Sequence, residues 1–131
     1  MKPMKEVITA PNAPKAMGPY SQAIRLNGMV FVSGQIPLDP QTGDLVSGSI
    51  QAQTERVLEN LKAVLQGAGL TLEHVVKTSV FLKNMADFSQ MNDIYGKYFS
   101  SNPPARTTVE VARLPRDVQV EMDVIAVDGR E

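Results

Sequence analysis

The sequence predicts an α+β fold in which two helices pack on one face of a mixed sheet of about six strands. Three observations lead to this prediction. Several short segments alternate apolar and polar residues with the period of two that half-buried strands show. Two longer segments, which begin near residues 50 and 86, instead repeat their apolar residues at helical spacing. The predicted order is strand, hairpin, helix, strand, helix, hairpin, and the 131 residues fit one domain, residues 1–131.

The part of the chain before the first helix predicts three strands. Residues 5–9 form the first strand, which ends at a proline-rich loop that extends to Pro19. Residues 21–26 and 29–33 are joined by Asn27-Gly28, the strongest short signal for a β-hairpin. A further turn is expected at residues 39–44, which read Asp-Pro-Gln-Thr-Gly-Asp.

The first helix begins at Ile50, where the period of the apolar residues becomes helical. Ser49 is its predicted N-cap, and Gly67 or Gly69 its predicted C-terminal stop. The apolar face consists of Ile50, Thr54, Val57, Leu58, Leu61, Val64 and Leu65. Residues 75–82 then predict a strand. Because this strand follows a helix, we expect it to pair in parallel with an earlier strand.

The second helix is expected over residues 86–99, with a cap at Asn84. Its apolar side consists of Phe88, Met91, Ile94, Tyr95 and Phe99. Asn92 interrupts this side, one turn from both Phe88 and Tyr95. A buried amide without partners is costly, so Asn92 is expected to bind either a loop or a ligand.

The two C-terminal segments, residues 106–111 and 118–124, both alternate with period two. The short Leu-Pro-Arg-Asp linker between them predicts that they pair as an antiparallel hairpin. If their apolar rows meet one core, Arg106, Thr108 and Glu121 share the opposite face. In either register Glu121 then lies opposite or diagonal to Thr108 and close to Arg106. That face is of mixed polarity, so we expect another subunit to cover part of it.

Composition excludes several classes of function. The net charge of -1 shows no basic surface for nucleic acid in the totals, which leaves a local basic patch open, and the absence of cysteine excludes disulfides and thiol chemistry. His74 is the one histidine, so a histidine-rich metal site is excluded, and no acidic cluster has metal-ligand spacing. No apolar run is long enough for a membrane span, and the first residues lack the apolar core of a signal peptide. We therefore expect a cytoplasmic protein.

Arg106 and Glu121 are the candidates for chemistry. A guanidinium meets a carboxylate through two parallel hydrogen bonds, so Arg106 would bind a small carboxylate. The alternative is a surface arginine or an ion pair with Glu110 or Asp123. Glu121 would position or deprotonate a water, or protonate a leaving amine. For Glu121 the alternative is a weak cross-strand salt bridge.

Two motifs supply candidate binding residues. Tyr20, in Gly18-Pro19-Tyr20, lies between a constrained loop and a strand, where its ring would close a pocket; the alternative is a core tyrosine. Ser33 and Gly34 end a strand, and Gly34 lets a ligand approach the backbone closely, although a plain turn is an equal alternative. No histidine pattern would make Ser33 a nucleophile.

Taken together, these segments resemble the RidA (YjgF) family of reactive-intermediate deaminases over nearly the whole chain. The matching segments are Gly-Pro-Tyr-Ser-Gln-Ala at 18–23, Val-Ser-Gly-Gln-Ile-Pro at 32–37, the surroundings of Asn92, Pro-Ala-Arg at 104–106, and residues 109–115 followed by Glu121. The resemblance implies a chorismate-mutase-like fold, and a homotrimer with a ligand cleft between adjacent subunits.

The resemblance also implies an activity. Such proteins hydrolyse 2-aminoacrylate, 2-iminopropanoate and 2-iminobutanoate to 2-keto acids and ammonia without a metal or organic cofactor, and so protect pyridoxal-phosphate enzymes. Arg106 would clamp the substrate carboxylate, and Glu121 would orient the water and handle protons. Tyr20, Ser33, Gly34 and Asn92 would line the cleft. Thr108 stands where the family often has cysteine, which leaves a backbone N–H to bind carboxylate but no thiol.

Three other functions stay open at this point. The same cleft would serve a sensor that binds a small 2-keto acid without turnover, although Glu121 beside Arg106 favours hydrolysis. An endoribonuclease or translation inhibitor is an activity reported within the wider family, but a net charge of -1 and seven aromatic residues argue against an RNA surface. For a structural or chaperone-like protein nothing in the sequence is distinctive. The preferred imine is also open.

Overall fold

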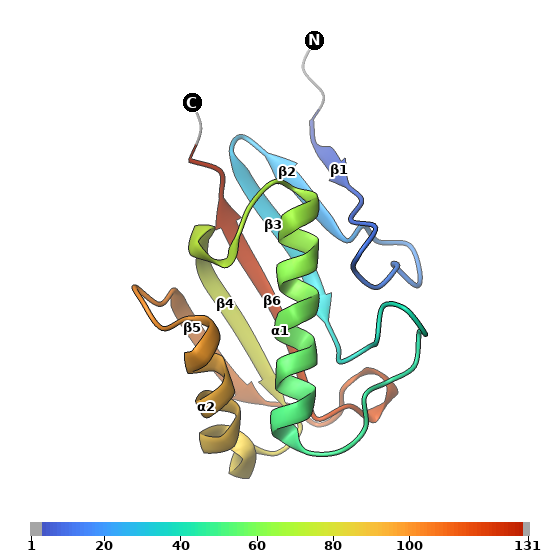
Figure 1. Cartoon of the computed structure of the whole chain (residues 1–131), viewed down its shortest axis with the longest axis vertical. Helices are drawn as coiled ribbons and strands as arrows, with labels where there is room; N and C mark the ends of the chain where they lie inside the picture. Colours follow the sequence, from blue (N-terminus) through green and yellow to red (C-terminus); the bar gives the residue numbers. More distant parts are fainter. Residues whose placement is uncertain (1–3, 130–131) are drawn as a thin grey trace.

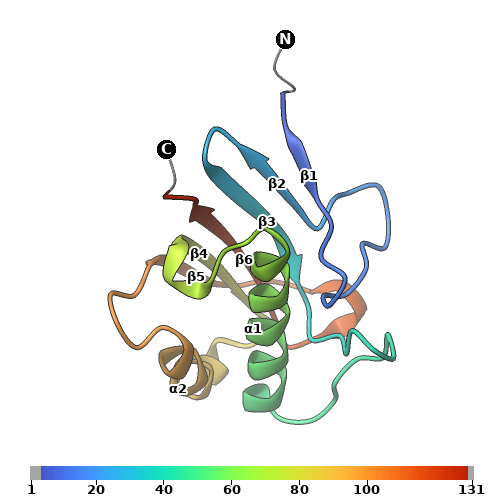
Figure 2. The same cartoon turned by 45° about the horizontal axis from the view of Figure 1, so that its top comes forward.

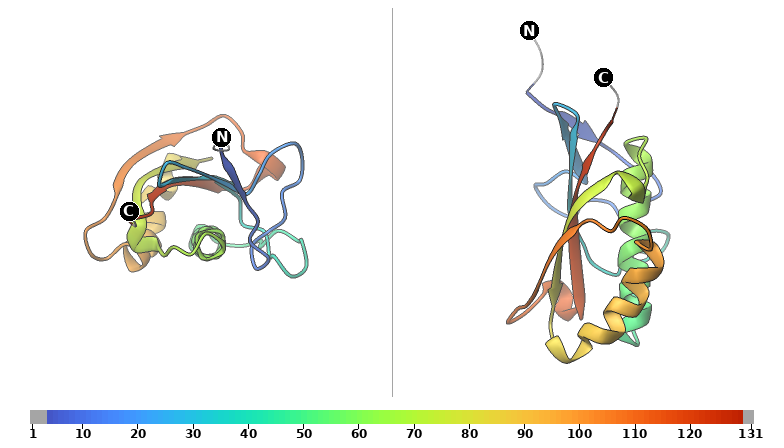
Figure 3. Two further views of the ribbon diagram at one scale, coloured as in Figure 1. Left: turned by 90° about the horizontal axis from the view of Figure 1, so that it is seen from above. Right: turned by 90° about the vertical axis from the view of Figure 1, so that its left-hand side faces the viewer.

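The protein has two helices packed on one face of a six-stranded mixed sheet, as the computed structural model describes for residues 4–129. Figure 1 and Figure 2 show α1 crossing the sheet with α2 beside it, and Figure 3 shows both helices on the same side. The strand order is β1-β2-β3-β6-β4-β5. The elements are β1 (Glu6–Ile8), β2 (Ala23–Leu26), β3 (Met29–Gln35), α1 (Ile50–Gly67), β4 (Val75–Leu82), α2 (Phe88–Tyr98), β5 (Ala105–Glu110) and β6 (Val120–Val127).

The first three strands form an antiparallel meander, which confirms the predicted strand and hairpin. Asn27 and Gly28 both have left-handed backbone angles, with φ of 51° and 79°, as a two-residue hairpin turn requires. The turn predicted at residues 39–44 is also present, because the Gly43 N–H donates to the Asp39 carbonyl over 2.8 Å.

Helix α1 begins and ends as the sequence predicts. The Ser49 hydroxyl accepts a hydrogen bond from the Ala52 N–H (3.1 Å), and Gly69 stops the helix with a φ of 77° two residues beyond its last helical residue. The apolar residues that predict the helix are all buried against the sheet. No helix in residues 4–129 is long and apolar enough to cross a membrane.

Helix α2 is shorter than the predicted 86–99. A 3₁₀ turn (Met85–Asp87), capped by Asn84, precedes it, and α2 itself starts at Phe88. Its buried residues, Met91 and Tyr95, belong to the predicted apolar side. The helix packs against α1 and lies over the β4–β5 edge of the sheet.

The predicted C-terminal hairpin is wrong. β6 lies in the middle of the sheet, antiparallel to both β3 and β4, whereas β5 is an edge strand that pairs in parallel with β4. The prediction that residues 75–82 pair in parallel with an earlier strand is also wrong, because the parallel partner is the later β5. The four core-facing residues of β6, from Val120 to Ala126, are 0–2% exposed. Such a fully buried row of side chains fits only a central strand. Burial of this row therefore outweighs the local preference of the short linker for a hairpin.

The strand order also shows that the prediction of one shared face for Arg106, Thr108 and Glu121 is wrong. In the β4–β5 register Arg106 pairs with Thr78 and Thr108 pairs with Val80, and Thr78 and Val80 are buried beneath the helices. Arg106 and Thr108 therefore point to the helix side. Glu121 pairs with Phe81 and alternates with the buried residues of β6, so it points to the other side. Arg106 and Glu121 do not share a face within one chain.

Candidate active site in two halves

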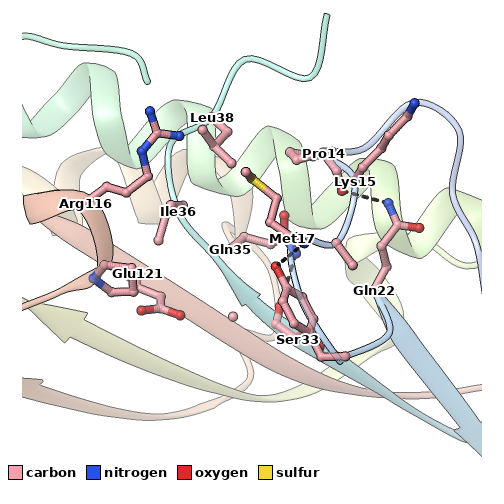
Figure 4. Close-up of a pocket in the computed structure, with 14 residues that line it drawn as sticks. Pro14, Lys15, Met17, Gln22, Ser33, Gln35, Ile36, Leu38, Arg116 and Glu121 are labelled. Atoms are coloured by element: carbon pink, nitrogen blue, oxygen red, sulfur yellow. Dashed lines mark hydrogen bonds between the residues drawn. The ribbon is translucent and has the colours of Figure 1, made fainter. Parts of the chain in front are cut away.

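A pocket of about 550 Å³ lies where the loop of residues 14–17, the end of β3 and the start of β6 meet (Figure 4). This volume is in the range of small-molecule sites. The pocket collects four of the predicted site residues, namely Tyr20, Ser33, Gly34 and Glu121. We call these four residues the acid cluster.

Glu121 lies against the backbone of β3 at Gly34. A Cβ atom on residue 34 would lie 2.1 Å from Glu121 Oε2, so only a glycine leaves room for the carboxylate. Gly34 is placed there by an irregularity in the β3–β6 register between Val32 and Gln35. Sequence reasoning gave Gly34 a ligand-approach role or a turn, whereas the structure places a side chain of the same protein over it.

The Glu121 carboxyl binds protons more readily than an ordinary glutamate. Burial raises its pKa, and the negative charge of Asp123, two residues along the same face of β6, raises it further. No described residue forms an ion pair with Glu121, so the cross-strand salt bridge considered above does not form.

Tyr20 and Ser33 hold the loop of the pocket. Tyr20 is 51% exposed, and its hydroxyl accepts a hydrogen bond from the Met17 N–H (3.2 Å), so it is no core tyrosine. The Ser33 hydroxyl donates to the Ser21 carbonyl over 2.6 Å. The proton of Ser33 is thus engaged within the chain, and its hydroxyl oxygen can still accept a hydrogen bond.

Gln22 is a site-building residue that sequence reasoning missed. Its buried amide accepts from the Ala10 N–H (2.6 Å) and donates to the carbonyls of Ala10 (3.2 Å) and Pro14 (2.8 Å). These three bonds fix the proline-rich loop against β2. The available signal was a glutamine just before a strand, next to a loop whose backbone groups need partners.

Arg106 belongs to a second cluster, on the helix side of β5. Its Nη1 donates to Asn92 Oδ1 over 2.7 Å, and its guanidinium carbon lies 4.7 Å from the centre of the Tyr95 ring and 5.5 Å from that of Phe88. Phe88, Asn92 and Tyr95 are at positions i, i+4 and i+7 of α2, which places them on one helix face. Asn92 interrupts the apolar side because it binds this arginine.

Two further hydrogen bonds and one hydroxyl without a partner among the described residues lie at this cluster. The Tyr95 hydroxyl and the buried Thr78 hydroxyl are 2.8 Å apart, and burial raises the pKa of Tyr95. The Thr108 hydroxyl is buried and has no hydrogen-bond partner among the described residues. Glu110 accepts from the Met85 N–H (2.7 Å) rather than from Arg106. We call Asn92, Arg106 and Thr108 the arginine cluster.

One chain therefore brings the predicted site residues together in two groups, not one. The acid cluster contains the half-buried carboxyl of Glu121, and the arginine cluster contains the guanidinium of Arg106. Within residues 4–129 no group of three or more histidine, aspartate or glutamate side chains could hold a metal ion.

Comparison with known proteins gives consistent results. A model of the family described as Endoribonuclease L-PSP matches residues 10–128. The RutC family protein PH0854 of Pyrococcus horikoshii is 54% identical over 123 residues, which is 94% of this chain and 98% of that protein. Reactive Intermediate Deaminase A, chloroplastic, of Arabidopsis thaliana is 48% identical over 122 residues, which is 93% of this chain and 65% of that protein.

Solved structures agree with these relatives. The crystal structure of YyfA from Yersinia pestis, a protein of the conserved Rid protein family, superposes with a TM-score of 0.91. It is 53% identical in sequence and covers 94% of this chain and 98% of its own.

Proposed function

Because the chain belongs to the Endoribonuclease L-PSP family, which includes the RutC and RidA (YjgF) proteins, we propose that it is an enamine and imine deaminase. It hydrolyses 2-aminoacrylate, its tautomer 2-iminopropanoate, and 2-iminobutanoate to the 2-keto acid and ammonia, and so protects pyridoxal-phosphate enzymes. The observation that carries the proposal is Glu121, a half-buried carboxyl with a raised pKa and no ion pair among residues 4–129, at the wall of a pocket of about 550 Å³.

The two clusters complement each other if they come from two copies of the chain. Arg106, the predicted carboxylate clamp, does not line the pocket of the acid cluster, whose cations are Lys15 and Arg116, and the arginine cluster contains no acid. The protein is accordingly a homotrimer in which the acid cluster of one subunit and the arginine cluster of its neighbour form one cleft. The opposite faces of Arg106 and Glu121 support this arrangement, since a single chain cannot present both to one small substrate.

Arg106 binds and orients the substrate. Asn92 fixes one edge of its guanidinium and two rings support its plane, which leaves the remaining N–H groups to bind the substrate carboxylate in a bidentate manner. Thr108, two residues along the same strand face, gives a further hydrogen bond from its backbone N–H. Holding the carboxylate in one place fixes the adjacent C=N bond relative to Glu121.

Glu121 performs the proton transfers. The protonated imine is an electrophile, and the Glu121 carboxylate accepts a proton from the water that attacks its carbon. The resulting carbinolamine carries one hydroxyl and one amine on that carbon. Glu121 then donates its proton to the nitrogen, the C–N bond breaks and ammonia leaves, and the hydroxyl proton passes back to the Glu121 carboxylate as the C=O bond forms. The raised pKa of Glu121 favours, relative to an ordinary glutamate, the protonated form that donates to the nitrogen.

The deciding experiment measures ammonia and keto-acid release from freshly generated 2-iminobutanoate. We expect acceleration by the wild type, loss with Arg106→Ala, and no loss with Lys62→Ala, which removes an exposed cation from α1. Binding of 2-oxobutanoate without any turnover would instead support a sensor.

Endoribonuclease activity is the second candidate, because the family description names it. The same three proteins are therefore incubated with RNA. Cleavage that survives Arg106→Ala would point to a different site or to a contaminating nuclease, whereas cleavage lost with Arg106→Ala and absent imine turnover would overturn the deaminase.

A further inference from the structure

Arg116 is the arginine that shares a pocket with Glu121 within one chain. It belongs to the connection between β5 and β6 and lines the same pocket as Glu121 and Gly34. Figure 4 shows its side chain beginning above Glu121 and extending towards Leu38. The deamination mechanism above uses neither this side chain nor the part of the pocket that it borders.

The backbone at Arg116 has an unusual conformation. Arg116 and Asp117 are two successive non-glycine residues with left-handed angles, with φ of 55° and 59°. Non-glycine residues seldom adopt this region, and two in a row need support from their surroundings. That support comes from hydrogen bonds of the Asp117 N–H to Leu114 and of the Val118 N–H to Pro115, and from the ion pair of Arg113 with Asp117 (2.7 Å). The loop is thus held in the form that places Arg116 at the pocket.

The charge of Arg116 is not balanced by a neighbour. No described carboxylate lies within ion-pair distance of it, and the adjacent Asp117 is engaged with Arg113. Glu121 is the one acidic residue among those that line the pocket. The guanidinium can therefore direct its N–H groups to an anionic group of an occupant.

Between Glu121 and Arg116 the pocket wall is apolar. Ile36 and Leu38 line this stretch, and Met17 closes it from the loop side. The volume of about 550 Å³ is far more than a methyl or ethyl side chain fills. Along the pocket wall, the carboxyl of Glu121 is thus followed by the apolar side chains of Ile36 and Leu38 and then by the guanidinium of Arg116. This order matches a substrate with a reacting carbon, a short methylene chain and a terminal carboxylate.

We infer that Arg116 is a second carboxylate-binding residue and that the pocket takes 2-imino acids whose side chain ends in a carboxylate, such as 2-iminoglutarate. This inference rests on the proposed function. The α-carboxylate is bound by Arg106 of the adjacent subunit, the C=N carbon lies at Glu121, and the distal carboxylate is bound by Arg116. The reaction adds one water across the C=N bond and releases 2-oxoglutarate and ammonia, with no oxidant or reductant.

The test compares kcat/KM for 2-iminobutanoate and 2-iminoglutarate, each generated during the assay. Arg116→Gln keeps a polar side chain of similar length but removes the charge, so kcat/KM for 2-iminoglutarate should fall about tenfold or more. The change for 2-iminobutanoate should be about twofold at most, and Arg116→Lys should recover part of the loss. An equal fall for both substrates, or none for 2-iminoglutarate, would overturn the inference. So would a larger selective loss in Lys15→Gln, which removes the other cation of the pocket.

A binding measurement separates this inference from the proposed function. Calorimetric titration of wild type and Arg116→Gln with 2-oxoglutarate and 2-oxobutanoate requires no turnover. Selective loss of 2-oxoglutarate affinity in Arg116→Gln would support the second carboxylate site even if neither imine is hydrolysed. Equal affinities of wild type and Arg116→Gln for 2-oxoglutarate would overturn it even if 2-iminobutanoate is hydrolysed rapidly.

Discussion

Arg106 and Glu121 lie on opposite faces of the sheet, with β4 between their strands. Two strand spacings alone separate their backbones by about 10 Å, and their side chains point away from each other. A single chain therefore cannot place both groups on one three- or four-carbon substrate.

This separation predicts that two inactive variants restore each other. Arg106→Ala and Glu121→Gln should each be nearly inactive, but a trimer refolded from an equal mixture should contain intact clefts. With random assembly about one quarter of the clefts take Glu121 from one variant and Arg106 from the other, so about one quarter of wild-type activity should return. A mixture as inactive as its components would contradict a cleft shared between subunits.

The raised pKa of Glu121 predicts a pH-dependent stability difference. A carboxyl whose pKa is higher in the folded state stabilises the fold while it is protonated, and that contribution is lost as the pH rises through the folded-state pKa. Glu121→Gln, which stays neutral, should therefore raise Tm at pH 8 and leave it nearly unchanged below the ordinary value of 4.5. Thermal unfolding from pH 4 to 8 measures this. A stabilisation that is largest at pH 4 would show the opposite sign.

The pH dependence of kcat/KM tests whether the negative charge of Asp123 raises the pKa of Glu121. Asp123 raises the pKa of Glu121 in addition to burial, so Asp123→Asn should shift the acidic limb of kcat/KM to lower pH. The maximum rate should change little, since Asp123 transfers no proton. An acidic limb that does not move would mean that another group controls it.

We expect Gly34→Ala to lower activity without a large loss of folding stability. The Cβ of Gly34→Ala would displace the Glu121 carboxylate, whose Oε2 would lie 2.1 Å away, so kcat should fall about tenfold or more. Gly96→Ala is the matched control. Nothing lies within 4 Å of its Cβ position in α2, and we expect about 0.5–1 kcal/mol of stabilisation with normal activity.

The sequence predicts local structure here better than strand order. Ser49, Asn27 and Gly28 determine a cap and a turn through contacts a few residues away, and the structure confirms them. The position of β6 depends instead on competition for the centre of the sheet, which no short linker reveals.

The same limit applies to the candidate site. Alternation shows that Arg106 and Thr108 share a face, but not which face of an edge strand meets the helices. The polar row of β5 turns to α2 because Asn92 and two aromatic rings receive the arginine there. Arg116 was not predicted as a pocket residue because its left-handed angles are invisible in the sequence.

The ring of Tyr95, rather than its hydroxyl, should govern substrate binding at Arg106. Tyr95→Phe removes the hydrogen bond with the Thr78 hydroxyl and should lower stability by about 1 kcal/mol, while KM stays within about twofold because the ring remains. Tyr95→Leu removes the ring 4.7 Å from the guanidinium and should raise KM for 2-iminobutanoate about threefold to tenfold.

Tyr98→Leu is the control that separates positioning from general destabilisation. It also removes a tyrosine from α2, and it breaks the hydrogen bond of the Tyr98 hydroxyl to Glu59 (2.7 Å), but the rings that the Arg106 guanidinium lies over are those of Phe88 and Tyr95, not Tyr98. We expect its Tm to fall while KM stays at the wild-type value. If Tyr95→Leu and Tyr98→Leu raised KM equally, the aromatic support of Arg106 would have no specific part in carboxylate binding, and the effect would belong to the packing of α2.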